Sequence, residues 1–229
     1  MRGESEASTS VIVPAYNEAA VIASVIAKLI KLNYDVVVVD DGSSDRTGEL
    51  AALAGASVLT HPVNLGQGAA LQTGIEFAMR QYAKYIVTFD ADGQHQATDI
   101  ARLTEALRRD EVDFALGSRF LGASVGIPFS RRMLLKAAIW FTRLMTGLRI
   151  TDTHNGLRAM TRRGAAKIAL RQNRMAHASE ILEQISRSGL GYVEVPVTIE
   201  YSRYSMAKGQ RLADSLLILF DLSAQRLHR

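Results

Sequence analysis

Short hydrophobic runs alternate with helical patterns through the first half of the sequence. The strand-like runs lie at residues 10–13, 36–39, 56–59, 85–89 and 114–116. Each run is rich in Val, Ile or Phe, and polar or glycine-containing turns separate the runs. Between them, hydrophobic positions recur every three or four residues, which is typical of a helix that buries one face. This alternation predicts an α/β fold with a mainly parallel sheet flanked by helices.

The second half of the sequence is less regular. Helical patterns lie at residues 133–147, 179–187 and 212–227, and extended segments lie at 192–197 and 199–201. The first and last of these helices are amphipathic, so they suit either a bilayer surface or packing on the protein core. No linker or repeat interrupts the chain, and its 229 residues suit a single domain spanning residues 1–229.

The composition is that of an ordinary globular protein, with 48% hydrophobic and 22% charged residues. Without cysteine, the chain has neither disulfides nor thiolate metal sites, and nothing indicates an oxidising compartment. Residues 1–10 are polar and acidic, unlike a secretory signal, and no run approaches the roughly 18 apolar residues of a membrane span. We therefore expect a cytoplasmic protein.

The charge is distributed unevenly between the two halves of the chain. Residues 1–129 hold 10 Lys and Arg against 16 Asp and Glu, whereas residues 130–229 hold 17 against 7. A basic half suits nucleic acid, anionic lipid headgroups or a phosphorylated substrate. Since no platform of aromatic residues accompanies these charges, we expect no nucleic acid partner. A solvated basic face without a ligand is the remaining alternative.

Two carboxylates one residue apart follow the hydrophobic run at residues 85–89. Asp90 and Asp92 belong to the segment Asp90-Ala91-Asp92-Gly93-Gln94-His95. Parallel sheets bind ligands at the carboxyl ends of their strands, where Asp40 and Asp41 also lie. Carboxylate oxygens suit Mg²⁺ or Mn²⁺, and such a cation keeps coordination positions open for substrate phosphates. The pattern favours a site for a divalent cation and a diphosphate.

The same acidic segment has three other interpretations, namely a calcium loop, a phosphatase motif and a helix cap, and the sequence argues against the first two. A calcium loop would need Gly at its sixth position and Glu at its twelfth, where the sequence has His95 and Ala101. A phosphatase that uses Asp-x-Asp-Gly as nucleophile and acid/base normally has this motif after its first strand, whereas about three strands precede Asp90. A polar turn that caps the helix beginning near Thr98 stays open as a structural alternative.

Five ordered motifs resemble those of the inverting family 2 glycosyltransferases, in the branch of dolichyl-phosphate mannose synthase and polyprenyl-phosphate sugar transferases. They are Val11-Ile12-Val13-Pro14-Ala15-Tyr16-Asn17-Glu18, Val39-Asp40-Asp41-Gly42-Ser43-Ser44-Asp45, Asn64-Leu65-Gly66-Gln67-Gly68-Ala69, Asp90-Ala91-Asp92 with Gln94, and Gly117-Ser118-Arg119. Similar acceptor-side segments follow at residues 152–158, 180–182, 194–197 and 203–208. The resemblance implies the Rossmann-like GT-A fold with C-terminal amphipathic helices. It divides the domain into a donor and metal half at residues 1–129 and a basic acceptor and membrane-surface half at residues 130–229.

The resemblance also implies the roles of individual residues. The nucleotide sugar is expected to contact Pro14, Ala15, Tyr16, Glu18, Asp40, Asp41, Gly42, Gly68, Asp90 and Ala91. Asp90, Asp92 and Gln94 are expected to hold Mg²⁺ or Mn²⁺, and Asp92, Arg119 and Glu180 to be catalytic. For Asp40 and Asp41 a turn-holding role is an alternative, and for Glu180 a capping role in its own helix is equally open.

A polyprenyl phosphate is the acceptor that the resemblance implies. Its phosphate oxygen is already anionic, so it needs cations for positioning more than a base for deprotonation. We expect these cations to be Arg131, Arg132, Arg158, Arg203 and Lys208. Such an acceptor would place the protein on the cytoplasmic face of the membrane, where a small, separately encoded membrane protein could tether it.

The chain departs from the family in two motifs. Gln67 stands where many members carry a basic residue, and His154, Asn155 and Leu157 replace the usual Thr, Ser and Phe, which leaves the acceptor contacts open. Two other functions also stay open, namely sugar transfer to a glycan hydroxyl and non-catalytic binding of a nucleotide sugar by a scaffold protein. Neither the sugar nor the base can be predicted from these residues.

Overall fold

A computed structural model describes residues 8–125, 129–172 and 176–200. The strands are β1 (Thr9–Ala15), β2 (Asp35–Asp40), β3 (Ser57–Thr60), β4 (Tyr85–Thr88), β5 (Phe114–Val125), β6 (Arg158–Thr161) and β7 (Tyr192–Glu200). The helices are α1 (Ile22–Lys31), α2 (Thr47–Leu53), α3 (Gln67–Arg80), α4 (Asp99–Arg109), α5 (Phe129–Thr146), α6 (Arg162–Ala165) and α7 (Ala176–Ser188). The strands form one sheet in the order β3-β2-β1-β4-β6-β5-β7.

The sheet is mainly parallel, as predicted. β1 pairs in parallel with β2 and β4, β2 pairs in parallel with β3, and β5 pairs in parallel with β7. Only β6, among the described strands, runs antiparallel to both of its neighbours, β4 and β5. The predicted α/β fold is therefore confirmed.

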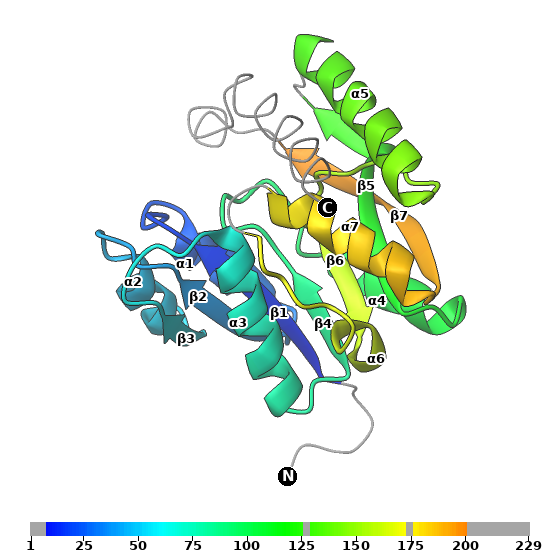
Figure 1. Cartoon of the computed structure of the whole chain (residues 1–229). Coiled ribbons are helices and arrows are strands. Elements are labelled where there is room, and N and C mark those ends of the chain that lie inside the picture. Colours follow the sequence, from blue (N-terminus) through cyan, green and yellow to red (C-terminus); the bar gives the residue numbers. More distant parts are fainter. Residues whose placement is uncertain (1–7, 126–128, 173–175, 201–229) are drawn as a thin grey trace.

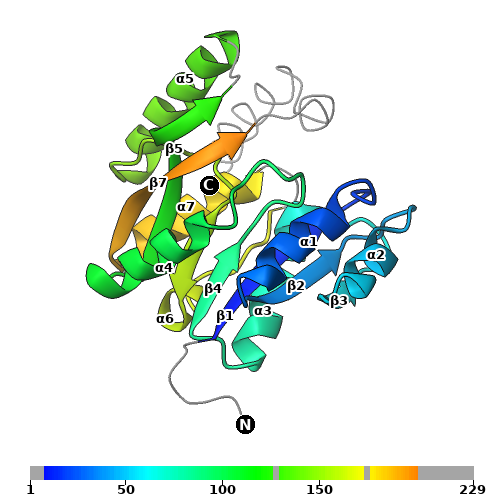
Figure 2. The same cartoon turned by 180° about the vertical axis from the view of Figure 1, so that it is seen from behind.

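Helices cover both faces of the sheet. Figure 1 looks onto the face covered by α3, α6 and α7, and Figure 2 onto the face covered by α1 and α4. The period of two along each strand divides its side chains between the faces. Val11 and Val13 of β1 pack in the core on the α1 side, whereas Ile12 packs in the core on the α3 side. The run Val36–Val39 is buried throughout, which explains why it shows no polar alternation.

Several elements differ from the expectation. β6 was not predicted, because it has only four residues and its sequence, Arg-Ala-Met-Thr, lacks a hydrophobic run. β7 is one continuous strand where two extended segments were predicted, and Pro196 is tolerated because β7 lies at the edge of the sheet. The helix predicted at residues 133–147 begins earlier, at Phe129, and Gly147, with φ +71°, follows its end. The helix predicted at residues 212–227 lies outside the described residues.

The strand order reverses at β1. The chain passes from β1 to β2 on one side, and β4 joins β1 on the other side, so a crevice is expected at the carboxyl ends of these strands. The segments that follow β1, β2 and β4 contain Tyr16, Asp41 and Asp90. In the described part of the chain, no helix is both long enough and apolar enough to cross a bilayer.

Candidate active site

The loops after β1 and β2 are joined by a hydrogen bond. The N–H of Asn17 donates to Oγ of Ser43 across 2.9 Å, and Asn17 has φ 53°, a conformation that Asn tolerates better than most residues. Pro14 and Ala15 are buried at the end of β1, and the side chain that follows them is exposed. The turn therefore presents the ring of Tyr16, 46% exposed, at the carboxyl end of the sheet.

Asp41 holds the loop that leads into α3. Its Oδ1 accepts hydrogen bonds from Nδ1 of His61 (2.7 Å) and from the N–H of Leu65 (2.9 Å), and its Oδ2 accepts from the N–H of Gly66 (2.7 Å). The side chain is buried. Both carboxylate oxygens thus hold the loop before α3 rather than the turn at Gly42 and Ser43, and a contact with a nucleotide base stays a prediction.

Asp40 closes its own turn. Its Oδ1 accepts a hydrogen bond from the N–H of Ser43 across 3.0 Å, and its carboxylate is also buried. Gly42 in this turn has φ +72°, and a Cβ there would lie 2.6 Å from the carbonyl carbon of Val63. The second motif therefore needs glycine at position 42 for both its backbone conformation and its close contact with the loop before α3.

The acidic loop after β4 contains two carboxylates with different partners. Oδ1 of Asp90 accepts a hydrogen bond from Nε2 of Gln67 (3.1 Å), and its Oδ2 accepts from Nε2 of His95 (3.1 Å). Asp92 accepts from the backbone N–H (3.0 Å) and the Nε2 amide (2.6 Å) of Gln94. Ala91 between them is buried in the core on the α1 side, which anchors the loop.

The two carboxylates differ in their electrostatics. Burial and the negative charge of Asp90 raise the pKa of Asp92, and Glu18 adds to this effect. Burial also acts to raise the pKa of Asp90, but the hydrogen bond from His95, together with the nearby positive charge of Arg158, outweighs it, so the pKa of Asp90 is lowered. The ionised form of Asp92 is therefore less favourable than that of an isolated aspartate.

The chemistry of this loop suits a divalent cation. Two carboxylates and the amide of Gln94 offer hard oxygen donors, and a bound cation would relieve the repulsion between Asp90 and Asp92. In the described ranges, no cluster of three or more His, Cys, Asp or Glu could enclose a metal. A divalent cation held by few protein ligands takes the others from substrate phosphates and water.

The start of α3 lies against the segment before α7. A Cβ at Gly68 would overlap the backbone carbonyl oxygen of Gln172, so only glycine fits at this contact. The segment is held by Glu180, whose carboxylate accepts from the N–H groups of Arg171 (3.1 Å) and Gln172 (2.9 Å). Glu180 therefore fixes the chain ahead of α7. Its catalytic role stays a prediction.

Arg119 forms a buried ion pair on the acceptor side. Its Nε donates to Oδ2 of Asp152 across 2.6 Å, and its Nη2 donates to the carbonyl oxygen of His154 across 2.9 Å. Glu194 of β7 supports this turn, since its Oε1 accepts from the N–H groups of Thr151 (2.7 Å) and Asp152 (3.2 Å). Burial raises the pKa of Glu194. The structure thus places Arg119 within a network of β5, β7 and the acceptor-side motif.

Arg158 is buried, and it forms hydrogen bonds with the backbone of neighbouring segments. Its guanidinium donates to the carbonyl oxygens of Asn155 (3.0 Å), Thr153 (3.1 Å) and Ala178 (3.4 Å). Burial lowers its pKa to about 10, so it stays charged near neutral pH. In this arrangement its donors bind the segment before β6 and the first turn of α7, and contact with an acceptor phosphate stays a prediction.

The other predicted phosphate cations are less fully described. Arg131 and Arg132 lie on the first turn of α5, and Arg203 and Lys208 lie outside the described residues. Conversely, several contacts of the site were not predicted, namely those of Gln67, His95, Asp152, Gly156 and Glu194. Each lies in or beside a recognised motif, but the pattern alone does not tell which side chains face one another.

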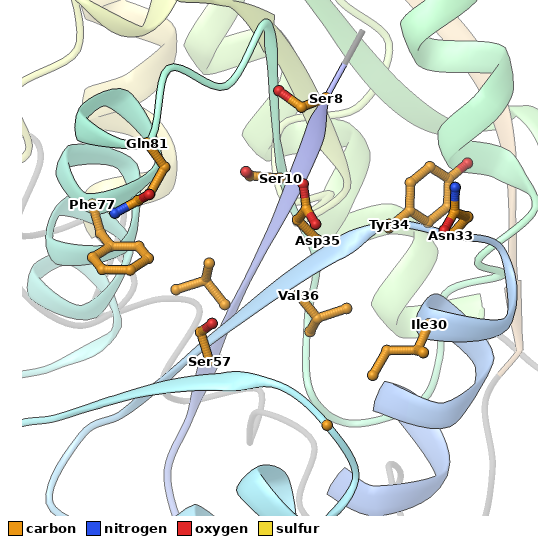
Figure 3. Close-up of a pocket in the computed structure, with 12 residues that line it drawn as sticks. Ser8, Ser10, Ile30, Asn33, Tyr34, Asp35, Val36, Ser57, Phe77 and Gln81 are labelled. Carbon is orange, nitrogen blue, oxygen red and sulfur yellow. The ribbon is translucent and has the colours of Figure 1, made fainter. Parts of the chain in front are cut away.

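A separate hollow lies at the opposite end of the sheet. It measures about 490 Å³ and is lined by Ser8, Ser10, Asn33, Asp35 and Gln81 among others, at the amino ends of β1 and β2 (Figure 3). The acidic loop follows the carboxyl end of β4, which is parallel to β1, so the hollow is not part of the candidate site.

Together, the sheet order and the acidic loop at its switch point fit the GT-A fold that the motifs predicted. The chain belongs to glycosyl transferase family 2, whose model matches residues 10–168. This confirms the resemblance that the motifs indicated.

Two relatives match over most of their length. The chain is 32% identical to UDP-N-acetylglucosamine–dolichyl-phosphate N-acetylglucosaminyltransferase of Methanococcus voltae, with 92% of this chain and 93% of that protein covered. It is 31% identical to polyprenol monophosphomannose synthase of Mycolicibacterium smegmatis, with coverages of 87% and 80%.

The fold is also similar to that of a solved structure. Glucosyl-3-phosphoglycerate synthase from Mycobacterium tuberculosis, crystallised with Mn²⁺ and UDP-glucose, aligns with a TM-score of 0.75 at 20% identity. The alignment covers 96% of this chain and 78% of that one.

Proposed function

We propose that this protein transfers a sugar from a GDP- or UDP-linked donor to a polyprenyl phosphate, with Mg²⁺ or Mn²⁺ as cofactor. The observation that carries the proposal is that two neighbouring carboxylates, Asp90 and Asp92, lie where the strand order of a family 2 chain reverses. Supporting it, one relative is named as a dolichyl-phosphate N-acetylglucosaminyltransferase and another as a polyprenol monophosphomannose synthase. The solved neighbour with Mn²⁺ and UDP-glucose supports the choice of cofactor and donor class.

The reaction would exchange one oxygen for another at the anomeric carbon of the sugar. An oxygen of the acceptor phosphate forms a bond to this carbon from the opposite face, while the bond to the donor's diphosphate oxygen breaks. The electron pair of that bond leaves with the nucleoside diphosphate. A bound divalent cation would stabilise the negative charge that develops on the leaving group.

The protein's own residues would bind and orient the two substrates. Asp92, with Gln94 beside it, would hold the cation, and Asp90 would support it directly or through water. Tyr16 and the turn at Gly42 would hold the nucleoside. Arg119, paired with Asp152, would add positive charge near the diphosphate. No general base is needed for an anionic acceptor.

The basic second half would bind the acceptor. We assign Arg131, Arg132, Arg203 and Lys208 to the phosphate side of the acceptor, on the basis of charge and position in the family's order. We also assign Arg158 to the acceptor side, where its charge would attract the phosphate, although its Nε and Nη2 groups donate to backbone carbonyl oxygens.

The exposed residues of α5 support binding of the protein to a membrane surface. Along this helix, Met133, Trp140 and Leu144 are 52%, 67% and 64% exposed, and the basic residues Lys136 and Arg143 are exposed among them. Exposed apolar side chains interleaved with basic ones suit an anionic bilayer surface. α5 and the carboxyl ends of β5 and β7 lie at the same end of the molecule (Figure 1). We propose that this end rests on the cytoplasmic face of the membrane.

A transfer assay with labelled nucleotide sugars tests the proposal. Purified protein, Mn²⁺ and vesicles containing polyprenyl phosphate should yield a labelled product that partitions into organic solvent and is released by mild acid. A water-soluble labelled oligosaccharide would instead show a hydroxyl acceptor. Donor binding without turnover on either kind of acceptor would show a non-catalytic scaffold.

A further inference from the structure

His95 is buried directly beside the acidic pair. Its side chain is 3% exposed, and its Nε2 lies 3.1 Å from Oδ2 of Asp90. The ring packs against Phe89, with 5.5 Å between the ring centroids and 58° between the planes. The imidazole is therefore held by a carboxylate at one edge and by a tilted contact with an aromatic ring.

The other nitrogen of this imidazole decides its tautomer. Nδ1 of His95 is buried and has no hydrogen-bond partner among the residues that the structure describes. A buried N–H without an acceptor is unfavourable, whereas the Asp90 carboxylate can only accept a hydrogen bond at the opposite edge. Both facts favour the tautomer that carries its proton on Nε2 and leaves Nδ1 bare.

The backbone around His95 is tied to the end of β7. His95 pairs with Ile199 in an antiparallel bridge, and the N–H of Glu200 donates to the carbonyl oxygen of Gln94 across 3.0 Å. Further along the loop, Oδ2 of Asp99 accepts from the N–H of Thr198 across 2.8 Å. His95 is thus held in place by a strand that is distant in sequence, which limits its movement relative to Asp90.

We propose that His95 is a positioning residue, which uses its Nε2–H to fix the orientation of the Asp90 carboxylate in the metal-diphosphate site. Gln67 acts on the other oxygen, since its Nε2 donates to Oδ1 of Asp90 across 3.1 Å. Asp92 is held differently, because both of its hydrogen bonds within the described structure come from Gln94, two residues away. Asp90 is therefore the fixed member of the pair, and Asp92 is the one that adjusts to the cation. This inference rests on the proposed function, because it assumes that the loop binds a cation.

Two substitutions of His95 by amide side chains test whether Nε2 or Nδ1 of the imidazole supports cation binding. In His95→Gln the side-chain amide nitrogen lies near the position of Nε2, whereas in His95→Asn it lies near that of Nδ1. Binding of Mn²⁺ together with UDP or GDP is measured by titration calorimetry, in which the premixed Mn²⁺–nucleotide complex is added to the full chain, and thermal unfolding of each variant reports folding. We expect H95N to weaken Mn²⁺ binding about tenfold or more, and H95Q to stay within about threefold of the wild type.

Two results would overturn the inference, namely equal Mn²⁺ affinity in all three proteins, or equal loss in both variants at unchanged thermal stability. If either variant fails to fold, the imidazole nitrogen shifts of the wild-type protein decide instead. A proton on Nε2 supports the inference, and a proton on Nδ1 refutes it. Absence of Mn²⁺ binding by the wild-type protein with both nucleotides would contradict the proposed function, while the nitrogen shifts would still report the His95–Asp90 contact.

Discussion

Gly156 lies so close to Asp90 that a Cβ at position 156 would overlap Oδ2 of the Asp90 carboxylate. The neighbouring strand end reinforces this contact, since Oγ1 of Thr88 donates to the carbonyl oxygen of Gly156 across 2.6 Å. The acceptor-side motif and the acidic loop are therefore in direct contact, although about sixty residues separate them in the sequence.

Replacing Gly156 by alanine should displace Asp90. We expect Gly156→Ala to lower the free energy of unfolding by about 1–3 kcal/mol through overpacking. It should also weaken Mn²⁺ binding about tenfold, because the carboxylate must move. Titration calorimetry and urea unfolding measure the two effects.

Gly189→Ala is the matched control for that variant. Gly189 has φ +67°, and a Cβ added there would have nothing within 4 Å, so alanine should lower the free energy of unfolding by about 1–2 kcal/mol without altering Mn²⁺ affinity. Equal Mn²⁺ affinity in Gly156→Ala and the wild type would show that Asp90 does not need its observed position.

Arg158 should matter more for folding than for acceptor binding. Arg158→Met removes donors from three backbone carbonyl oxygens, and we expect the free energy of unfolding to fall by about 2–4 kcal/mol. Urea unfolding measures this loss. Unchanged stability together with a raised KM for the acceptor would contradict the structural role and favour direct contact with phosphate.

The ion pair between Asp113 and Arg163 should make stability depend on pH. The hydrogen bond from Arg163 lowers the pKa of Asp113, so the folded-state pKa lies below the unfolded value of about 3.9. This stabilisation is present above about pH 4 and is lost as the pH falls through the folded-state pKa. Asp113→Asn should therefore be less stable than the wild type at pH 7, and the difference should shrink at lower pH.

Urea unfolding of both proteins between pH 3 and 7 checks this dependence. Asp110→Asn serves as the control, because the Asp110 side chain is 30% exposed and its pair is screened by solvent, whereas the Asp113 side chain is 3% exposed. A difference between Asp113→Asn and the wild type that stays constant across the range would disprove the linkage.

The exposed face of α5 should bind anionic vesicles. Trp140→Ser removes the largest exposed apolar side chain on the helix, and we expect the partition coefficient onto vesicles to fall about tenfold. Leu53→Ser on α2 is the control, since Leu53 is 74% exposed but lies on another element. Equal losses in the two variants, or none in Trp140→Ser, would place the membrane contact elsewhere.

The sequence predicted the elements that form the donor half of the sheet because each is a hydrophobic run with a polar end. The carboxylates at the ends of β2 and β4 could be found in the same way, since parallel strands place their carboxyl ends together. β6 could not be found, because this four-residue strand lacks a hydrophobic run and takes its stability from pairing with β4 and β5 rather than from its own pattern.

The side-chain contacts within the site could not be predicted from the sequence either. Gln67, His95 and Gly156 all contact Asp90, but they come from α3, the acidic loop and the turn before β6. Likewise, the pattern could not tell that Arg158 is buried, because charge alone suggests exposure. Such relationships depend on how elements pack, which a local pattern does not contain.

The most direct test of the metal-diphosphate site is thermal unfolding with a panel of nucleoside diphosphates, with and without Mn²⁺. A ligand that binds only the folded state stabilises it by about 2.7 kcal/mol at a concentration of one hundred times Kd. We expect UDP or GDP to raise the melting temperature of the wild-type protein only when Mn²⁺ is present, and Asp92→Asn to abolish the rise. A rise that is the same without Mn²⁺ and in Asp92→Asn would contradict a cation held at Asp92.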